Sequence, residues 1–226
     1  TAPAEVIAVS AFTKTIEDQL QKVFNYKSQG NLSTSPEFPL INFQNDPNKG
    51  RVYGMEFELR KSAAFIAPSL KYFFFTGNVM LAMSRIDKNP ERLNASRTND
   101  RRSPATSPVF EQAPYSINAG LDYNNPKSKT NLSLNFNIVG ARLILVQLDG
   151  TPDIFDRPVP VLDLVFTRQL GERWLLKGFA KNLLDPAYRQ VYTNAGNNGK
   201  YHGETYVYRQ YKRGSEFSLG IAWKIL

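Results

Sequence analysis

The sequence predicts an all-β chain, an antiparallel transmembrane β-barrel of which about eight strands are present. Apolar and polar residues alternate with a period of two over stretches long enough to cross a membrane, which takes a strand of about 9 to 11 residues. The connections between these stretches are alternately short and long. That alternation is typical of a barrel with short turns at one end and long loops at the other.

The last twelve residues, SEFSLGIAWKIL, show the period most clearly. One face carries only apolar side chains, namely Phe217, Leu219, Ile221, Trp223 and Ile225. The residues between them are small or polar, and the only charge in the alternating part, Lys224, lies on that second face. The same separation of apolar from charged positions recurs in YGMEFELR (53–60), YSINAGLDY (115–123) and NLSLNFNI (131–138). Four further strands are expected with a less regular pattern, at 5–16, 72–84, 161–170 and 174–184.

The two faces of these strands predict two environments. Because a charge on the lipid side near the membrane midplane costs about 2 to 4 kcal/mol, the uncharged faces are expected to meet lipid. The other faces should line the interior, where water or another polypeptide satisfies Glu56, Glu58, Arg60, Asn118, Asp122, Asn135 and Asp163. Aromatic residues at strand ends fit the girdles of such barrels, and these are Tyr53, Tyr115, Tyr123 and Trp223.

Loop lengths are expected to sort by end. Short links occur near 61–70, 124–129 and 170–173. Long loops are expected over 17–40, 87–112, 149–159 and 185–205. A soluble sandwich of two sheets also alternates in and out, but nothing in its physics sorts its loops by length in this way.

Composition excludes several functions. The 226 residues contain no Cys, which excludes a thiolate metal site, and the single His202 leaves little for imidazole metal ligation or a Ser-His-Asp arrangement. We therefore expect no catalytic residues, no metal and no cofactor. Cys-free chains fit an oxidising compartment. The net charge is +8, but the basic segment 85–102 mixes both signs, as in a solvated loop, and no nucleic-acid partner is expected.

Four stretches resemble the C-terminal part of a TonB-dependent outer-membrane receptor. GFAKNLLDPAY carries the most specific match, an Asn-Leu-x-Asp-x-x-Tyr run that the family has in its penultimate strand, here Asn182, Leu183, Asp185 and Tyr188. The segment 51–84 resembles a strand, periplasmic turn and long ascending strand, and 113–123 resembles a descending strand after a large loop. RGSEFSLGIAWKIL resembles the closing strand, although it ends in Leu226 where the family has an aromatic residue.

The resemblance implies a barrel of 22 strands filled by an N-terminal plug domain. Residues 1–226 would then be the C-terminal part of that barrel, its last eight strands, without the plug, the TonB-contacting segment or a signal peptide. The implied location is the outer membrane. The implied partners are its lipid, the plug and remaining strands in the same or another chain, TonB through the plug, and a surface lipoprotein.

The resemblance also implies energy-coupled uptake of a ligand such as a siderophore, haem, cobalamin, oligosaccharide or peptide. Guanidinium groups pair well with carboxylates and phosphates, so a basic loop could capture an anionic ligand, and the candidates are Arg97, Arg101 and Arg102. Contact with lipopolysaccharide phosphates, or plain solvation, is the other interpretation of that loop.

Two other functions fit the sequence. A self-contained eight-stranded outer-membrane barrel with an adhesive or structural role would close on itself around a side-chain-filled interior. A soluble basic β-sandwich that binds polyanions would need no detergent. The first differs from the receptor segment in what pairs with strand 5–16, because unpaired backbone groups in lipid cost several kcal/mol each.

Overall fold

The computed structural model describes residues 5–25, 40–192 and 206–225. His202, Leu226 and the loop around the former lie outside the described residues. The larger of two sheets contains eight long strands, with a short ninth, β6 (Thr106–Ser107), beside β5. In spatial order the eight are β1 (Val6–Ile16), β4 (Gly50–Ser62), β5 (Phe73–Asp87), β7 (Tyr115–Asn125), β8 (Thr130–Val139), β11 (Val161–Leu170), β12 (Trp174–Lys181) and β15 (Glu216–Trp223).

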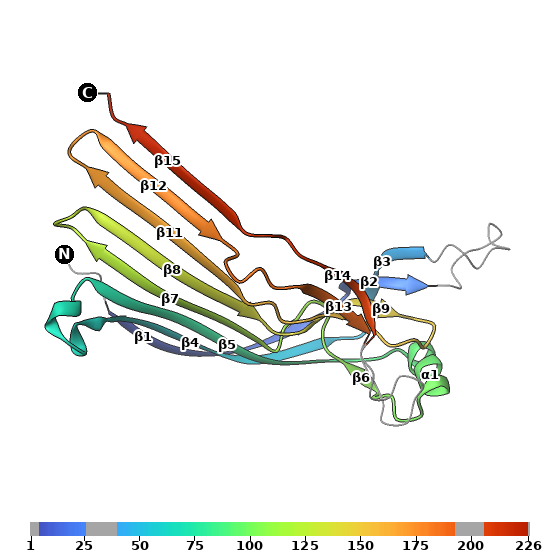
Figure 1. Cartoon of the computed structure of the whole chain (residues 1–226). Helices are drawn as coiled ribbons and strands as arrows, with labels where there is room; N and C mark the ends of the chain where they lie inside the picture. Colours follow the sequence, from blue (N-terminus) through green and yellow to red (C-terminus); the bar gives the residue numbers. More distant parts are fainter. Residues whose placement is uncertain (1–4, 26–39, 193–205, 226) are drawn as a thin grey trace.

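These eight strands confirm the predicted all-β antiparallel class and occupy the eight predicted positions. Each pairs with its neighbour in antiparallel fashion, and the sheet curls along its width (Figure 1). No pairing joins β1 to β15 among the described residues, so the sheet has two outer edges.

The strand register places the predicted apolar faces on one side of the sheet. One transverse row runs through directly opposed residues of six strands: Phe75, Leu121, Leu134, Leu164, Ala180 and Phe217. Opposed residues in antiparallel strands point to the same face. This face, called the apolar face below, is unusually exposed for large hydrophobic side chains, with Leu219 at 74% and Met83 at 78%. All five apolar residues of the closing strand are exposed on it.

Aromatic residues border the apolar face at both ends. Near the short turns, the Trp174 and Trp223 rings stack with centroids 6.1 Å apart, and Tyr123 packs against Phe73 at 4.9 Å. Toward the long loops lie Tyr53 and Tyr115, both on the same face by register. The arrangement is the one expected of interfacial girdles.

A second, six-stranded sheet forms at the long-loop end. Its order is β14 (Val207–Tyr211), β13 (Tyr188–Tyr192), β10 (Ile154–Asp156), β9 (Arg142–Gln147), β2 (Gln19–Asn25) and β3 (Leu40–Asp46). The large sheet consists of four hairpins, in chain order β1 with β4, β5 with β7, β8 with β11, and β12 with β15. The first, third and fourth of these continue into the six-stranded sheet. Among the described residues, β2 and β9 are the only strands that pair in parallel, and they join the first hairpin to the third.

The expectation of simple long loops over 17–40, 149–159 and 185–205 is therefore wrong for the described parts of these segments. Changes of backbone direction separate the strands of the six-stranded sheet from those of the large sheet, with positive φ at Asp18 (49°) and at Gly214 (77°). The stretch RLILVQ of β9 has no alternation because it is covered on both faces, with Leu143, Leu145 and Val146 at most 3% exposed. Continuous apolar runs of this length do not identify a strand by period.

The segment 87–112 also contains more than a loop, because α1 (Pro90–Asn99) forms there. Asn89 caps it by accepting a hydrogen bond from the Arg92 backbone N–H at 2.8 Å, and Pro90 occupies the first turn, where its missing N–H costs nothing. Within the part of the chain that the structure describes, no helix is long and apolar enough to cross a membrane.

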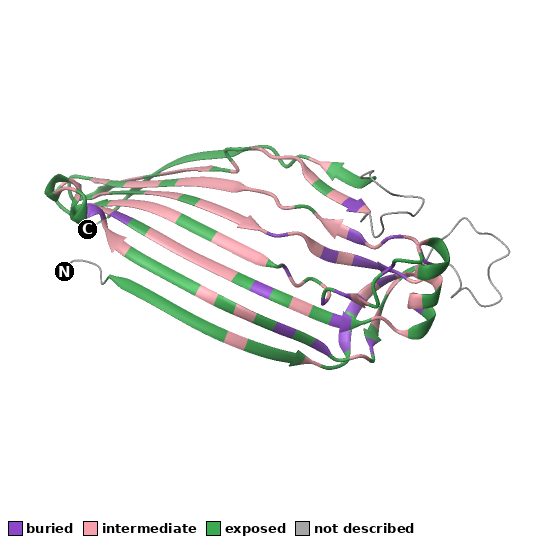
Figure 2. Ribbon diagram, turned by 90° about the horizontal axis from the view of Figure 1, so that it is seen from below, coloured by how far each residue is buried: buried purple, intermediate pink, exposed green. Residues whose placement is uncertain are grey.

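Two short 3-10 helices, η1 (Ala63–Phe65) and η2 (Pro68–Leu70), form the turn between β4 and β5. The packed core instead concentrates at the long-loop end (Figure 2). There Val52, Ala82, Ile86 and Val109 form one buried cluster, and Val23, Leu143 and Val146 form another. The two buried apolar clusters therefore lie where the two sheets meet.

Candidate functional site

The face opposite the apolar face, called the polar face below, gathers the interior residues that the sequence predicts. One transverse row contains Glu58, Asn78, Asn118 and Asn137, and the next contains Arg60, Thr76, Gly120, Asn135 and Asp163. Glu56 and Asp122 lie on the same face one row to either side. The register therefore brings all seven predicted residues together on one surface.

Hydrogen bonds across the strands order part of this surface. The Asn137 amide donates to Asn118 Oδ1 at 2.6 Å, and the Ser133 hydroxyl donates to Asp122 Oδ1 at 2.5 Å. Asp163 of β11 holds the residue that follows β12, because its Oδ1 accepts a hydrogen bond from the Asn182 backbone N–H at 2.8 Å. A hollow of about 480 Å³ lies over the two rows and is lined by Glu58, Arg60, Asn78, Asn118 and Asn135 among others.

A second hollow of about 260 Å³ lies where the third and fourth hairpins enter the six-stranded sheet, and it is lined by arginines and tyrosines. We call it the arginine–tyrosine hollow; its polar lining residues are Asn137, Arg142, Asp156, Arg157, Tyr188, Arg189, Gln190, Tyr211 and Arg213. Asn137 also lines the first hollow, so the two adjoin on the polar face.

Charge in the arginine–tyrosine hollow is strongly unbalanced. Asp156 is its one carboxylate, and it is already engaged by Arg142 at 3.0 Å and by the Gln190 amide at 3.0 Å. The Arg213 guanidinium lies 4.3 Å from the Tyr188 ring, which stacks on Tyr211 at 5.2 Å. Hydrogen bonding to Tyr211 raises the pKa of Arg213 further, so it stays cationic. The hollow thus offers several guanidinium groups, two of them held by Asp156 and by the Tyr188 ring, to an anionic ligand.

Sequence reasoning missed this hollow. Its arginines come from four places in the chain, and of the four only Arg213 lies in a basic stretch, beside Lys212. The strand pairing of the six-stranded sheet brings them together. One signal did point there, because the Asn-Leu-x-Asp-x-x-Tyr run ends at Tyr188.

The first part of that run, Asn182 to Asp185, lies in the turn after β12, and Tyr188 begins β13, so the placement of the run within a strand over 174–184 is wrong. The strand β12 ends at Lys181, and Asn182 and Asp185 have positive φ values of 54° and 38°. Both side chains tie this turn to the return strand. The Asn182 amide donates to the Gly214 carbonyl at 2.7 Å, and Asp185 accepts from the Gly214 N–H at 3.0 Å while pairing with Lys212.

The basic loop residues occupy a different surface. Arg97 lies in the last turn of α1, and Arg101 and Arg102 follow in the next turn; all three are exposed. None of them lines either hollow among the described residues. Arg97 Nε donates to the Ser103 carbonyl at 3.4 Å, which ties it to its own loop.

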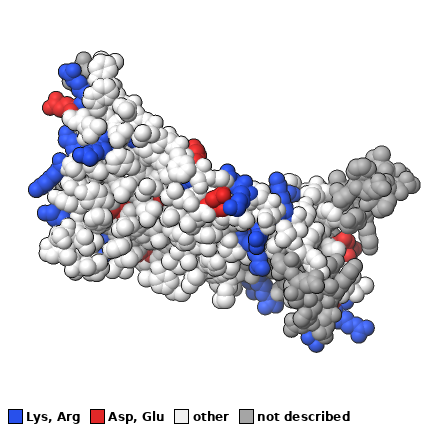
Figure 3. Space-filling view, in the orientation of Figure 1, with Lys and Arg blue, Asp and Glu red and all other residues white. Residues whose placement is uncertain are grey.

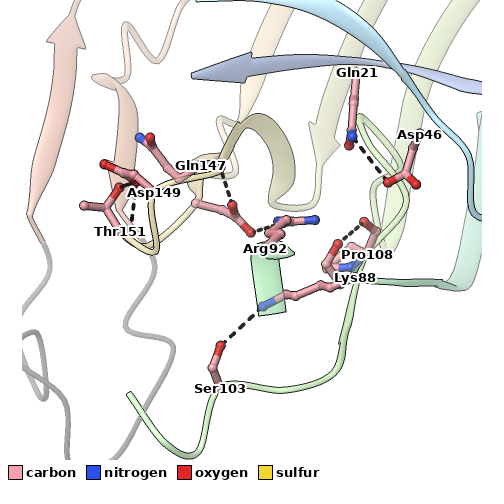
Figure 4. A network of polar contacts seen from close by, with 11 residues as sticks. Gln21, Asp46, Lys88, Arg92, Ser103, Pro108, Gln147, Asp149 and Thr151 are labelled. Carbon is pink, nitrogen blue, oxygen red and sulfur yellow. Dashed lines mark hydrogen bonds and ion pairs between the residues drawn. The ribbon is translucent and has the colours of Figure 1, made fainter. Parts of the chain in front are cut away.

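A buried polar network fixes α1 against the β9–β10 turn (Figure 4). The Arg92 side chain is 3% exposed and pairs with Asp153 at 2.6 Å, while Asp153 also accepts from the Gln147 backbone N–H at 2.9 Å. Lys88 donates to the Ser103 hydroxyl at 3.3 Å, and burial lowers the pKa of Lys88. The network holds the loop in place.

Gly150 brings the β9–β10 turn against α1. A Cβ on Gly150 would lie 2.3 Å from the Ala95 carbonyl oxygen, and its φ of +90° already requires glycine.

Comparison with known proteins identifies the fold. No protein-family model matches the sequence, and no curated protein matches it. Among solved structures, the chain is similar to the ferric-catecholate import receptor Fiu of Escherichia coli K12, with a TM-score of 0.55 and 13% identity over 96% of this chain. It is also similar to two mutants of the ferric enterobactin receptor PfeA of Pseudomonas aeruginosa, with TM-scores of 0.55 and 0.53 and identities of 12% and 14%, each over 99% of this chain.

The chain spans 25 to 30% of the length of these receptors. At such identities the similarity is one of fold. The chain therefore has the fold of a portion of a receptor β-barrel, which confirms the resemblance that the sequence motifs predict.

Proposed function

We propose that this chain is part of the barrel wall and extracellular loops of a TonB-dependent outer-membrane receptor. The observation that carries the proposal is the open sheet of eight antiparallel strands, with an exposed apolar face and a polar face behind it. Such a sheet can reside in lipid only if its outer edges are paired, because lipid satisfies no backbone N–H or C=O group.

The remaining barrel strands are the proposed partners of β1 and β15. The receptors of similar fold are more than three times as long as this chain, which leaves room in a complete receptor for further strands and a plug. The polar face, with Glu56, Glu58, Arg60, Asn118 and Asp122, would then meet plug or lumen water. TonB would act through the plug, and a surface lipoprotein is a further proposed partner on the outside.

For the ligand we propose an anionic molecule such as a siderophore, held at the arginine–tyrosine hollow. Four guanidinium groups and one engaged carboxylate support an anionic ligand. The names of the similar structures refer to ferric catecholates and ferric enterobactin, which agrees with this charge. Arg97, Arg101 and Arg102 are proposed as a first capture site on the outer loop surface.

Uptake of iron-55 as a catecholate complex by cells making the complete polypeptide tests the ligand proposal. Replacing Arg157 and Arg189 with Gln should reduce ligand affinity about tenfold or more, since charge-assisted contacts are lost. Lys127→Gln with Lys129→Gln removes two cations at the short-turn end and should leave uptake unchanged. Equal uptake by the two double variants would refute the hollow as the site. Unchanged uptake by Arg101→Ala with Arg102→Ala would refute the capture role.

The intact mass of the mature protein from its native source tests whether the chain is a segment. A receptor predicts a mass several times the 25.6 kDa of this chain. A mature protein of that smaller mass would favour the self-contained barrel with an adhesive or structural role.

A further inference from the structure

Two arginines stand side by side on the apolar face, just beyond its apolar stretch at the long-loop end. Arg51 of β4 and Arg85 of β5 are directly opposed in the register, and both are exposed. The next opposed pair toward the middle of the strands is Tyr53 and Met83, on the same face. The pair therefore marks the place where the apolar face gives way to charge.

The spacing along β4 matches the thickness of a membrane. Arg51 and Lys61 are the charged residues on this face of β4, and between them Tyr53, Met55, Phe57 and Leu59 carry none. Ten residues of strand cover about 33 Å, and a tilt of about 45° reduces this to about 23 Å along the membrane normal. The apolar band of outer-membrane barrels is about 25 Å tall. Arg51 and Arg85 thus lie at the level of lipid headgroups on the loop side.

The two guanidinium groups outnumber the carboxylates in the hollow that they share. They share a hollow of about 510 Å³ with Asn48, Lys49, Tyr53 and Asp87. Lys49 is paired with Glu17 at 2.6 Å, and no ion pair to Arg51 or Arg85 is found among the described residues. Like charges directly opposed across two strands destabilise a sheet. One carboxylate, Asp87, against two guanidinium groups leaves a net positive site.

We propose that Arg51 and Arg85 bind a phosphate of a phosphorylated lipid headgroup in the surrounding leaflet. Guanidinium groups present paired donors that match phosphate oxygens, and a phosphate between the two would relieve their repulsion. Tyr53 and Met83 lie directly below, where acyl chains begin. Figure 3 shows the related pattern over one whole face, with Lys and Arg toward the two ends of the long strands and little charge between them. The inference rests on the proposed insertion of this sheet in the outer membrane.

Native mass spectrometry of the complete polypeptide in detergent tests the site, with lipid A that carries both phosphates as the probe. Replacing Arg51 and Arg85 with Gln should weaken lipid A binding about tenfold or more, because two charge-assisted contacts are lost. Arg51→Lys with Arg85→Lys keeps both charges without the paired donors and should bind with intermediate affinity. Lys177→Gln with Lys181→Gln removes two exposed cations from the polar face and should change nothing.

Three results would overturn the proposal: equal affinity in the Arg51/Arg85 and Lys177/Lys181 double variants, equal binding of the same lipid without phosphates, or displacement of the lipid by inorganic phosphate, which would indicate a site for free anions. Electrophoretic mobility with and without boiling reports the folded barrel separately. If the unaltered protein migrated identically with and without boiling, it would form no folded barrel, and the proposed function itself would be contradicted. A folded barrel with unaltered lipid affinity in the Gln variant would contradict only the lipid site.

Discussion

Individual side chains decide how the long-loop end is held together. Arg92 is the clearest case, since an arginine that is 3% exposed is tolerated only with a partner, and Asp153 lies 2.6 Å away. The sequence presents Arg92 as one of many cations in a mixed-charge segment. Its burial depends on the β9–β10 turn, about 60 residues later in the chain, so local pattern could not distinguish it from exposed Arg97 or Arg101.

Replacing Arg92 with Ala should open α1 and the β9–β10 turn. Removing one partner of a buried pair deprives the Asp153 carboxylate of its Arg92 counter-charge, at a cost of about 3 to 5 kcal/mol. Hydrogen–deuterium exchange of the α1 and β9–β10 amides measures this loss as faster local opening. Lys49→Ala breaks an exposed pair with Glu17 and serves as the control, with little change expected. Similar exchange in both variants would show that Arg92 is not a structural anchor.

Gly150 provides a second test at the same contact. Gly150→Ala should dislodge the turn from α1, because the added Cβ would meet the Ala95 carbonyl at 2.3 Å in addition to the strain of a positive φ. Gly171→Ala is the matched control, since Gly171 has a φ of +63° with no atom within 4 Å of the added Cβ. The control should cost only the backbone strain, about 1 to 2 kcal/mol. Thermal unfolding of both variants compares them, and equal midpoints would count against the close contact.

Whole elements follow the sequence where one face is uniform. Four of the eight long strands were clearly predictable because alternation persists over many residues, and a shift of register by one would exchange the two faces completely. The other four were predictable with a less regular pattern. The six-stranded sheet was not predictable from alternation. Its strands are as short as three residues in β10, they are covered on both sides in β9, and their pairing joins segments far apart in sequence.

The assignment of the two faces can be tested on one strand. Leu134 and Asn135 are neighbours in the middle of β8, on the apolar and polar faces respectively. Leu134→Arg should destabilise the protein in lipid vesicles by about 2 to 4 kcal/mol, the cost of a charge near the midplane on the lipid side. Asn135→Arg should be tolerated, because the polar face is hydrated or meets polar groups. Urea unfolding in vesicles measures both, and a reversed order would exchange the two faces.

At the scale of the whole molecule, the large sheet has two outer edges that are unpaired among the described residues. β1 and β15 end the sheet, and large apolar side chains remain exposed near both, such as Ile7 at 77% and Leu219 at 74%. The resemblance to the large receptors implied that the outer edge of strand 5–16 pairs with a strand outside residues 1–226, whereas a self-contained barrel would pair it with the closing strand. The alternation also predicted that seven polar and charged residues share one face, whereas the arginine–tyrosine hollow required the three-dimensional pairing of the third and fourth hairpins.

Disulfide formation between the two edge strands, in the complete polypeptide in native outer membranes, tests the central claim most directly. Residues 1–226 contain no cysteine, so no native thiol within them competes with the introduced pairs. Lys177→Cys with Gly220→Cys, directly opposed in β12 and β15, should cross-link and serves as the positive control. Cysteines at Ser10 in β1 combined with Ser218 or Gly220 in β15 should not cross-link if these strands are separate staves of a larger barrel. A disulfide between β1 and β15 would show that the eight strands close on themselves and would contradict the receptor segment.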